Sequence, residues 1–290
     1  MGGFMAAKTV LITGSSSGFG RAAAMRFRKT GWRVAATMLN TDEWKEAETS
    51  DDLLVLPLNV EDLESIKSAL HRTIKHFGKI DCVVNNAGRG MFSVFEATPI
   101  EAARALFETN VFGVLQVTQA ILPHFRSNGG GCLINVSSGV GIVSEPLMSI
   151  YGATKFAVEG FTESIAYECA SQNISVKLIE PGLVQGTNFV ENAIASSKVA
   201  SVPPSYQGFV NQTQAMIKEP SPLQRATESD VAEAIVAAAT DTSGQLRHLV
   251  GSDAAMLAHM RWETSEQQYR TWARSKYGPK NQPTGSATAR

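Results

Sequence analysis

Residues 8–20 of the sequence are Lys8-Thr-Val-Leu-Ile-Thr13-Gly14-Ser-Ser-Ser-Gly18-Phe-Gly20. The apolar, β-branched run 8–13 predicts a strand buried on both faces, and a helix is expected over 21–29. A glycine turn between a strand and a helix favours pyrophosphate binding, because glycines let backbone amides approach the phosphates and the helix N-terminus carries partial positive charge. The glycines are spaced Gly-xxx-Gly-x-Gly rather than Gly-x-Gly-xx-Gly, so a tight turn without a ligand remains an alternative.

The alternation of strand and helix continues along the chain. Nearly continuous apolar strands separated by helical patterns predict a single α/β domain: a Rossmann-type, doubly wound parallel sheet of about seven strands with helices on both faces. Functional residues should then follow the carboxyl ends of strands. We assign 1–252 to this domain and 253–290 to a C-terminal helix and flexible tail. The further strands are predicted at 33–38, 53–58, 80–84, 132–136, 175–179 and 246–250.

The composition is that of an ordinary soluble globular protein. Of the 290 residues 43% are hydrophobic and 18% charged, with a net charge of −1, so nothing in the charge favours a nucleic-acid or anionic-membrane partner. The run lengths predict no membrane span. Three cysteines, Cys82, Cys132 and Cys169, have neither a zinc-binding nor a disulfide spacing, and we expect buried thiols in the cytoplasm and no metal site.

Local signals mark the ends of several elements. Thr98-Pro99-Ile100-Glu101 and Thr227-Glu-Ser-Asp230 predict helix starts with capping boxes, the second helix running through Ala239. The segment 183–222 is too long for an ordinary connection and is rich in Ser, Pro and Gln, so we expect a lid or substrate loop. One helix is expected over 254–276 and a disordered tail over 278–290.

Tyr151 and Lys155 suggest acid–base chemistry. If a helix begins near Tyr151, the phenol and the ammonium lie one turn apart on the same face. The loop 139–150 would fold back and bring the Ser138 hydroxyl, which ends an apolar run, to the same place. Taken alone, a Tyr–Lys pair at this spacing is more often a surface feature, and a mid-helix Asn such as Asn110 is more often a buried structural residue.

Taken together, these stretches resemble the short-chain dehydrogenase/reductase family over nearly the whole chain. Gly14-xxx-Gly18-x-Gly20 looks like the family's cofactor turn, Asn85-Asn86-Ala87-Gly88 resembles its stretch after the fourth strand, and Pro181-Gly182 stands in the expected place. The match to the catalytic tetrad includes the thirteen-residue spacing between Ser and Tyr, which selects Ser138 over Ser137. The matching tetrad residues are Asn110, Ser138, Tyr151 and Lys155.

The resemblance implies hydride transfer between a nicotinamide cofactor, NAD(P)(H), and a secondary alcohol or a carbonyl compound. Tyr151 would exchange the proton, Ser138 would donate to the substrate oxygen, Lys155 would also hold the nicotinamide ribose, and Asn110 would anchor a proton-relaying water. The residues implied in cofactor binding are Gly14, Ser16, Ser17, Gly18, Phe19, Gly20, Met38, Leu39, Asn59, Val60, Asn86, Ala87, Gly88, Tyr151, Lys155, Pro181, Gly182, Val184 and Thr187.

This role requires a shifted pKa for Tyr151. A free phenol has a pKa of about 10, so a phenolate near neutrality needs roughly 4 kcal/mol of stabilisation. The Lys155 ammonium at ~5 Å would supply about 3 kcal/mol of it at an effective dielectric constant of about 20.

Three positions depart from the family pattern. Met38 and Leu39 stand where relatives place an acidic residue for NAD or a basic one for NADP; the surrounding sequence favours NADP(H). Asn59 replaces an Asp that commonly contacts adenine. One extra residue precedes Thr187, which puts its contact with the carboxamide in doubt.

The expected substrate is a hydrophobic ketone or secondary alcohol, as for steroid, retinol and bacterial carbonyl relatives. The alternatives are a dehydrogenase of polyols or sugars, a sugar-nucleotide epimerase, and a non-catalytic dinucleotide-sensing protein. Relatives commonly pair through the helices carrying Asn110 and Tyr151, so a homodimer or homotetramer is expected. The candidate wall residues, each of which could equally belong to the core, are Met91, Phe92, Val140, Ile142, Leu147, Met148, Leu183, Phe189 and Phe209.

Overall fold

The computed structural model describes residues 7–44, 49–184, 193, 202–219 and 223–280. Thr187 and Phe189, two residues singled out from the sequence, lie outside these ranges. The strands are β1 (Thr9–Ile12), β2 (Arg33–Met38), β3 (Thr49–Ser50), β4 (Leu53–Pro57), β5 (Cys82–Asn85), β6 (Gly131–Val136), β7 (Ile174–Pro181) and β8 (Arg247–Val250). The helices are α1 (Gly18–Lys29), α2 (Leu63–Phe77), α3 (Ile100–Phe107), α4 (Gly113–Ser127), α5 (Ser149–Ala170), α7 (Gln207–Lys218), α8 (Glu228–Thr240), α9 (Ser252–Trp262) and α10 (Glu266–Tyr277). Short helical turns are η1 (Thr41–Glu43), η2 (Phe95–Ala97), η3 (Glu108–Phe112), η4 (Gly139–Gly141) and η5 (Pro204–Tyr206).

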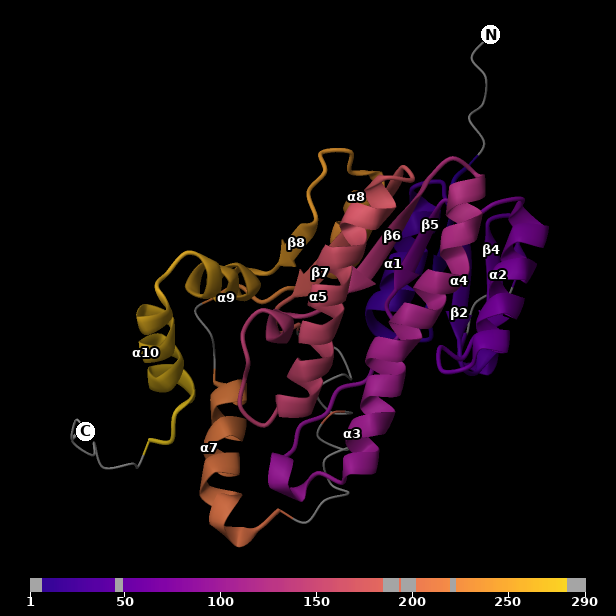
Figure 1. The fold of residues 1–290 in the computed structure, drawn as a ribbon. Helices are drawn as coiled ribbons and strands as arrows, with labels where there is room; N and C mark the ends of the chain where they lie inside the picture. Colours follow the sequence, from indigo (N-terminus) through magenta and orange to yellow (C-terminus); the bar gives the residue numbers. More distant parts are fainter. Residues whose placement is uncertain (1–6, 45–48, 185–192, 194–201, 220–222, 281–290) are drawn as a thin grey trace.

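One sheet runs through the molecule with the strand order β3-β4-β2-β1-β5-β6-β7-β8. Seven of these strands are parallel, which confirms the predicted sheet (Figure 1). The two-residue strand β3 pairs antiparallel with β4 at the edge and escaped prediction. The order reverses between β1 and β5, and in open sheets of this kind ligands bind at that switch point, beyond the carboxyl ends of the strands.

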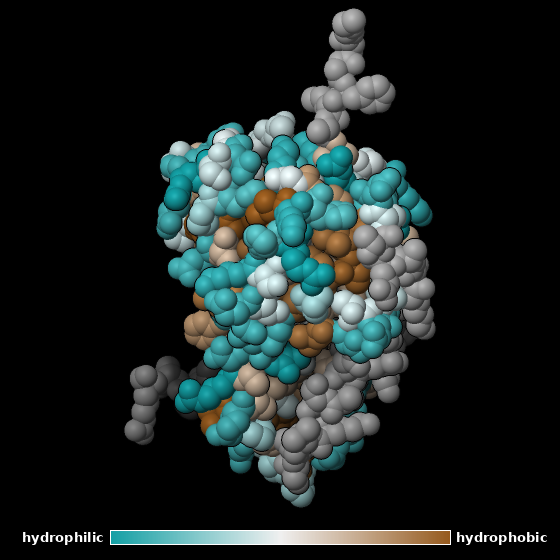
Figure 2. Space-filling model, turned by 90° about the vertical axis from the view of Figure 1, so that its right-hand side faces the viewer, coloured by the Kyte–Doolittle hydropathy of each residue, from teal (hydrophilic) through white to brown (hydrophobic). Residues whose placement is uncertain are grey.

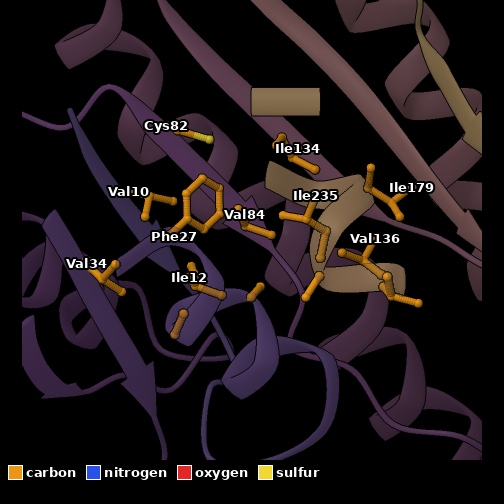
Figure 3. Close-up of a cluster of buried hydrophobic side chains, with 14 of the residues drawn as sticks. Val10, Ile12, Phe27, Val34, Cys82, Val84, Ile134, Val136, Ile179 and Ile235 are labelled. Carbon is orange, nitrogen blue, oxygen red and sulfur yellow. The ribbon is translucent and has the colours of Figure 1, made fainter. Parts of the chain in front are cut away.

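Helices cover both faces of the sheet. On one face, α1 and α8 pack together, with Phe27 and Ile235 lying over strand residues such as Ile12, Val84 and Ile134 (Figure 3). On the other face, α2, α4 and α5 bury a second apolar cluster. Strands buried on both faces explain why the sequence shows continuous apolar runs rather than alternation.

Of the two predicted capping boxes, the structure confirms one and contradicts the other. The Thr227–Asp230 capping box is present at the start of α8. The predicted box at Thr98 is wrong: Pro99 is the N-cap of α3, and the Thr98 hydroxyl donates instead to the carbonyl of Val94 at 2.9 Å. The short helical turn η2 that precedes α3 has therefore taken the side chain that the sequence pattern assigned to the helix cap.

The C-terminal region contains two helices rather than the single one predicted over 254–276. The chain breaks between α9 and α10, where Ser265 and Gln268 form a capping box that starts α10. In Figure 1, α10 lies to one side of the sheet, next to α7. Gln212 of α7 donates to the carbonyl of Gly278 and accepts from the amide of Lys280, and these two hydrogen bonds join α7 to the chain after α10.

One helical stretch of the described residues is long and apolar enough to span a membrane: Ile100–Ser127, formed by α3, η3 and α4. It packs against α2 and α5, and 44% of its most apolar window is buried inside the fold. On the face shown in Figure 2, hydrophobic residues form separate patches among hydrophilic ones, as on ordinary globular proteins.

Candidate active site

The glycine turn after β1 is locked against the loop after β5. Gly14 has a φ of +68°, and a Cβ at this position would lie 2.8 Å from Cα of Ala87. A Cβ on Gly20 would lie 2.3 Å from the carbonyl oxygen of Gly14. Asn86 donates through Nδ2 to the carbonyls of Thr13 and Gly14, at 2.9 and 3.0 Å. The two predicted motifs therefore form one surface at the switch point.

This surface suits a phosphate. Ser17 is the N-cap of α1, but its side chain makes no cap hydrogen bond, and the first turn carries no acidic residue. Amides and partial positive charge at this terminus are thus available to an anion, whereas the glycines prevent side chains from filling the space. The local geometry fits the pyrophosphate of a dinucleotide.

Four residues were predicted to contact the adenosine part of the cofactor, and the structure places them in different environments. Met38 is 2% exposed and its side chain belongs to the core, while Leu39 is 75% exposed. Asn59 accepts the amide of Glu61 through Oδ1 at 3.0 Å, so Nδ2 is its remaining donor for an adenine. Val60 packs against Gly113 at the start of α4.

Tyr151 and Lys155 lie one turn apart on α5, and both are buried. The Lys155 Nζ is 5.7 Å from the centre of the Tyr151 ring and donates to the carbonyl of Val136, at the end of β6, at 2.9 Å. Ser138 is the N-cap of η4, accepts the Val140 amide through Oγ and is hydrogen-bonded to Tyr151. The structure therefore brings these three predicted residues together.

Asn110 lies in the π-helical turn η3, between α3 and α4. Its Oδ1 accepts the amide of Arg89 at 2.8 Å, and its Nδ2 donates to the Arg89 carbonyl at 2.8 Å and to the Thr154 hydroxyl at 3.2 Å. π-helical turns of this kind are frequent at functional sites. The side chain thus ties the loop after β5 to the helix that carries Tyr151 and Lys155.

Burial disfavours the charged forms of both Tyr151 and Lys155. Burial raises the pKa of Tyr151 above its ordinary value, although the hydrogen bond with Ser138 lowers it in part. Burial also lowers the pKa of Lys155 to about 8, partly offset by the negative charge of Glu159. The sequence predicted a lowered Tyr151 pKa, with Lys155 and the positive charge of the oxidised nicotinamide supplying the shift. In the protein alone the direction is the opposite, because the desolvation of a buried phenolate outweighs its stabilisation.

A partly buried ionic cluster, which includes the Glu159 that acts on Lys155, was not predicted from the sequence. Arg247 of β8 contacts Glu159 and Glu163 of α5 and Glu180 of β7, each at 2.5 Å. Burial and the neighbouring Glu159 raise the pKa of Glu180 to about 8. The i,i+4 spacing of Lys155 and Glu159 was the available sequence signal.

A second missed residue is Asp253, at the start of α9. Its Oδ2 accepts the amide of Leu183 at 2.7 Å, and a Cβ on Gly182 would lie 2.2 Å from its Oδ1. The C-terminal region thereby holds the Pro181-Gly182 turn in place.

A cavity of about 620 Å³ opens beside these residues. Its wall includes Tyr151 and Ser138 together with Phe19 of the glycine turn. Of the nine wall residues proposed from sequence, four line it: Phe92, Val140, Met148 and Leu183. Four others do not and pack in apolar clusters beside it: Met91, Ile142, Leu147 and Phe209. Pro181, Gly182 and Val184 line the cavity as well.

Within the described ranges, no group of three or more His, Cys, Asp or Glu side chains could hold a metal ion. Cys82, Cys132 and Cys169 are free thiols and are buried, as the sequence predicted for their side chains.

Comparisons with known proteins place this geometry in a family. The family model "short chain dehydrogenase" matches residues 8–198. An uncharacterised oxidoreductase of Schizosaccharomyces pombe is 39% identical over 201 residues, covering 69% of this chain and 83% of that protein. Human retinol dehydrogenase 8 is 35% identical over 207 residues, covering 68% and 65%.

Solved structures share the fold. A short-chain dehydrogenase from Streptomyces avermitilis superposes with a TM-score of 0.79 at 31% identity, covering 94% of this chain and 98% of that one. More distant structures, at 23% and 22% identity, are complexes with NAD and with NADP. On the match over residues 8–198, and on the relatives that share it, this chain belongs to the short-chain dehydrogenase family of oxidoreductases.

Proposed function

We propose that the protein interconverts an alcohol and the corresponding ketone or aldehyde, using NAD(P)(H) and acting on a hydrophobic substrate. The observation that carries this proposal is the convergence of Tyr151, Ser138 and the glycine turn on one cavity. When bound there, the nicotinamide supplies or accepts the hydride.

The side chains handle the proton. In carbonyl reduction, Tyr151 donates its hydroxyl proton to the substrate oxygen as the carbonyl carbon is reduced, and in alcohol oxidation it takes the proton back. Ser138 donates a hydrogen bond to the same oxygen. The raised pKa of Tyr151 keeps the phenol protonated at neutral pH, which is the form that carbonyl reduction needs. Lys155, anchored on the Val136 carbonyl, stabilises the phenolate left after proton transfer.

The proposed cofactor contacts follow the glycine turn. Gly14, Gly18 and Gly20 would let the pyrophosphate approach the N-terminus of α1, and Leu39 would border the adenosine. Because neither Met38 nor Leu39 carries a carboxylate to repel a 2′-phosphate, the proposal favours NADP(H). Michaelis constants for NADPH and NADH would decide between the cofactors, and a lower constant for NADH would overturn this preference.

The apolar lining supports a hydrophobic substrate over a polyol. Phe92, Val140, Met148 and Leu183 all face the cavity. We would follow NAD(P)H absorbance against a panel of bulky apolar ketones and polar sugars. Faster turnover of the sugars would favour the polyol alternative. A protein that binds the cofactor but turns over nothing would favour the dinucleotide-sensing alternative, which does not require the assembled Ser138, Tyr151 and Lys155.

We further propose a homodimer or homotetramer that works in the cytoplasm. Phe112 and Phe156, from the helices expected at the interface, are 47% and 40% exposed, a feature that favours self-association there. Light scattering of wild type and Phe156→Glu would test the interface, since an unchanged molar mass in the variant would contradict it. The three free buried thiols support a reducing compartment, and cell fractionation is the direct measurement.

A further inference from the structure

The cavity has a second set of polar residues that the catalytic steps do not use. Glu145 lies in the segment between Ser138 and Tyr151, whereas Lys276 and Tyr277 come from the end of α10. We call these three residues the distal polar group. Glu145 lies far from Lys276 and Tyr277 in the sequence, yet all three line the cavity that Tyr151 also lines.

The distal polar group is built by direct contact. The Tyr277 hydroxyl donates to Oε1 of Glu145 at 3.1 Å. The Lys276 ammonium lies 5.1 Å from the centre of the Tyr277 ring and 5.2 Å from that of Trp272. The end of α10 is also tied to α7, because Gln212 donates to the Gly278 carbonyl at 2.9 Å.

Glu145 has hydrogen-bonding capacity to spare. Among the described residues, the hydrogen bond from Tyr277 goes to Oε1 and none goes to Oε2, and the half-buried side chain lines the cavity. Burial raises the pKa of Glu145, and the charge of Lys276 and the bond from Tyr277 lower it only in part. A carboxyl oxygen that borders a cavity can accept a hydrogen bond from a ligand inside it, and a bond to a charged acceptor of this kind adds affinity.

The charges around Glu145 select the ligand. A carboxylate would meet Glu145 and Asp253, which also lines the cavity, and an ammonium would meet Lys276. A purely apolar group would leave Glu145 Oε2 unpaired. A hydroxyl can donate to Glu145 and accept from Lys276 at the same time.

We propose that the distal polar group binds a hydroxyl of the substrate, so that the substrate is an amphipathic carbonyl compound carrying a hydroxyl remote from its reacting carbon. This inference rests on the proposed carbonyl reduction. Two of the three residues, Lys276 and Tyr277, lie beyond residues 8–198, the span that the family model matches.

The test uses straight-chain methyl ketones of several lengths that end in a methyl, a hydroxyl or a carboxylate group. At the best length, we expect kcat/KM for the hydroxyl ketone to exceed that for its methyl counterpart about tenfold, mainly through KM. Glu145→Met and Tyr277→Phe should reduce that preference to about twofold or less, while turnover of the methyl ketone stays within about twofold of wild type. Lys276→Met should weaken the preference, whereas the control Arg274→Met, on the same helix but outside the cavity wall, should leave it intact.

Three outcomes would overturn the inference: equal kcat/KM for the hydroxyl and methyl ketones, a preference for the carboxylate, or a hydroxyl preference that survives Glu145→Met. Glu145→Gln, which keeps the size and a polar head, guards against a folding defect in the Met variant. Failure of the proposed function would look different, because no ketone would then oxidise NADPH or NADH. In that event, calorimetric titration of the hydroxyl and methyl ketones into wild type and Glu145→Met still decides the inference, since only tighter binding of the hydroxyl ketone to wild type supports it.

Discussion

The two walls of the cavity are built in different ways. The catalytic wall stands on the sheet: Lys155 is anchored to the backbone of β6, and Ser138 and Tyr151 lie at the end of that strand and on the long helix α5. The C-terminal wall stands on the short helices α7 and α10, which are held by side-chain bonds such as Tyr277 to Glu145 and lie beside the sheet (Figure 1). A rigid wall suits proton transfer, which depends on exact distances, and an appended wall suits recognition, which can change without disturbing the chemistry.

The largest effect is expected at the catalytic wall. Tyr151→Phe removes the proton donor while keeping the ring, so kcat should fall by about a thousandfold with the affinity for NADPH within about threefold. Absorbance assays with a reactive ketone measure the first quantity, and fluorescence titration with NADPH measures the second. Turnover close to wild type would remove Tyr151 from the proposed mechanism.

The next effect concerns the glycine turn. Gly20→Ala places a Cβ 2.3 Å from the Gly14 carbonyl, so the turn must move; we expect about 2 kcal/mol of destabilisation and a loss of cofactor affinity of about tenfold or more. Urea unfolding and cofactor titration measure the two effects. The matched control is Gly160→Ala on the open face of α5, which should gain roughly 0.5–1 kcal/mol through helix propensity. If the two variants behaved alike, the close approach at Gly20 would not matter.

A smaller effect should appear in the pH profile. The negative charge of Glu159 raises the pKa of Lys155, which burial has lowered to about 8. Glu159→Gln removes that charge, so Lys155 loses its proton at a lower pH, and the alkaline limb of kcat/KM for carbonyl reduction should move to lower pH.

The control for this prediction is Glu163→Gln. Glu163 contacts the same Arg247, but its side chain is 54% exposed. Glu163→Gln should shift the alkaline limb of the kcat/KM profile much less than Glu159→Gln does, because solvent screens the charge of Glu163. Equal shifts for the two variants would indicate a general effect on Arg247 rather than on Lys155.

The smallest expected effect is a change in KM without a change in kcat. Ser265→Ala breaks the capping box of α10 and should cost about 1 kcal/mol of stability while raising KM for the preferred ketone about two- to threefold, with kcat nearly unchanged. Thr227→Ala breaks the box of α8, which packs on the sheet, and should cost a similar stability without raising KM. Thermal unfolding and steady-state kinetics test the pair; a KM increase in both variants, or in neither, would contradict the division between the walls.

The sequence by itself determined the elements whose signals are local. Continuous apolar runs identified the seven parallel strands, and the i,i+4 spacing identified Tyr151 and Lys155 as neighbours. The glycine turn could also be predicted from the sequence, because its residues follow one another directly along the chain. These features depend on residues that are close in sequence, and the periodicity of strands and helices reports on them directly.

Only the tertiary structure decided how distant residues meet. The contacts of Arg247 with Glu159 and Glu180, the bond of Tyr277 to Glu145, and the use of Asp253 to hold the turn after β7 all join segments far apart in the chain. Tertiary packing also raised the pKa of Tyr151, because it buries the phenol. Such effects depend on which elements the sheet order places side by side and on how much water they exclude, and no local pattern encodes either quantity.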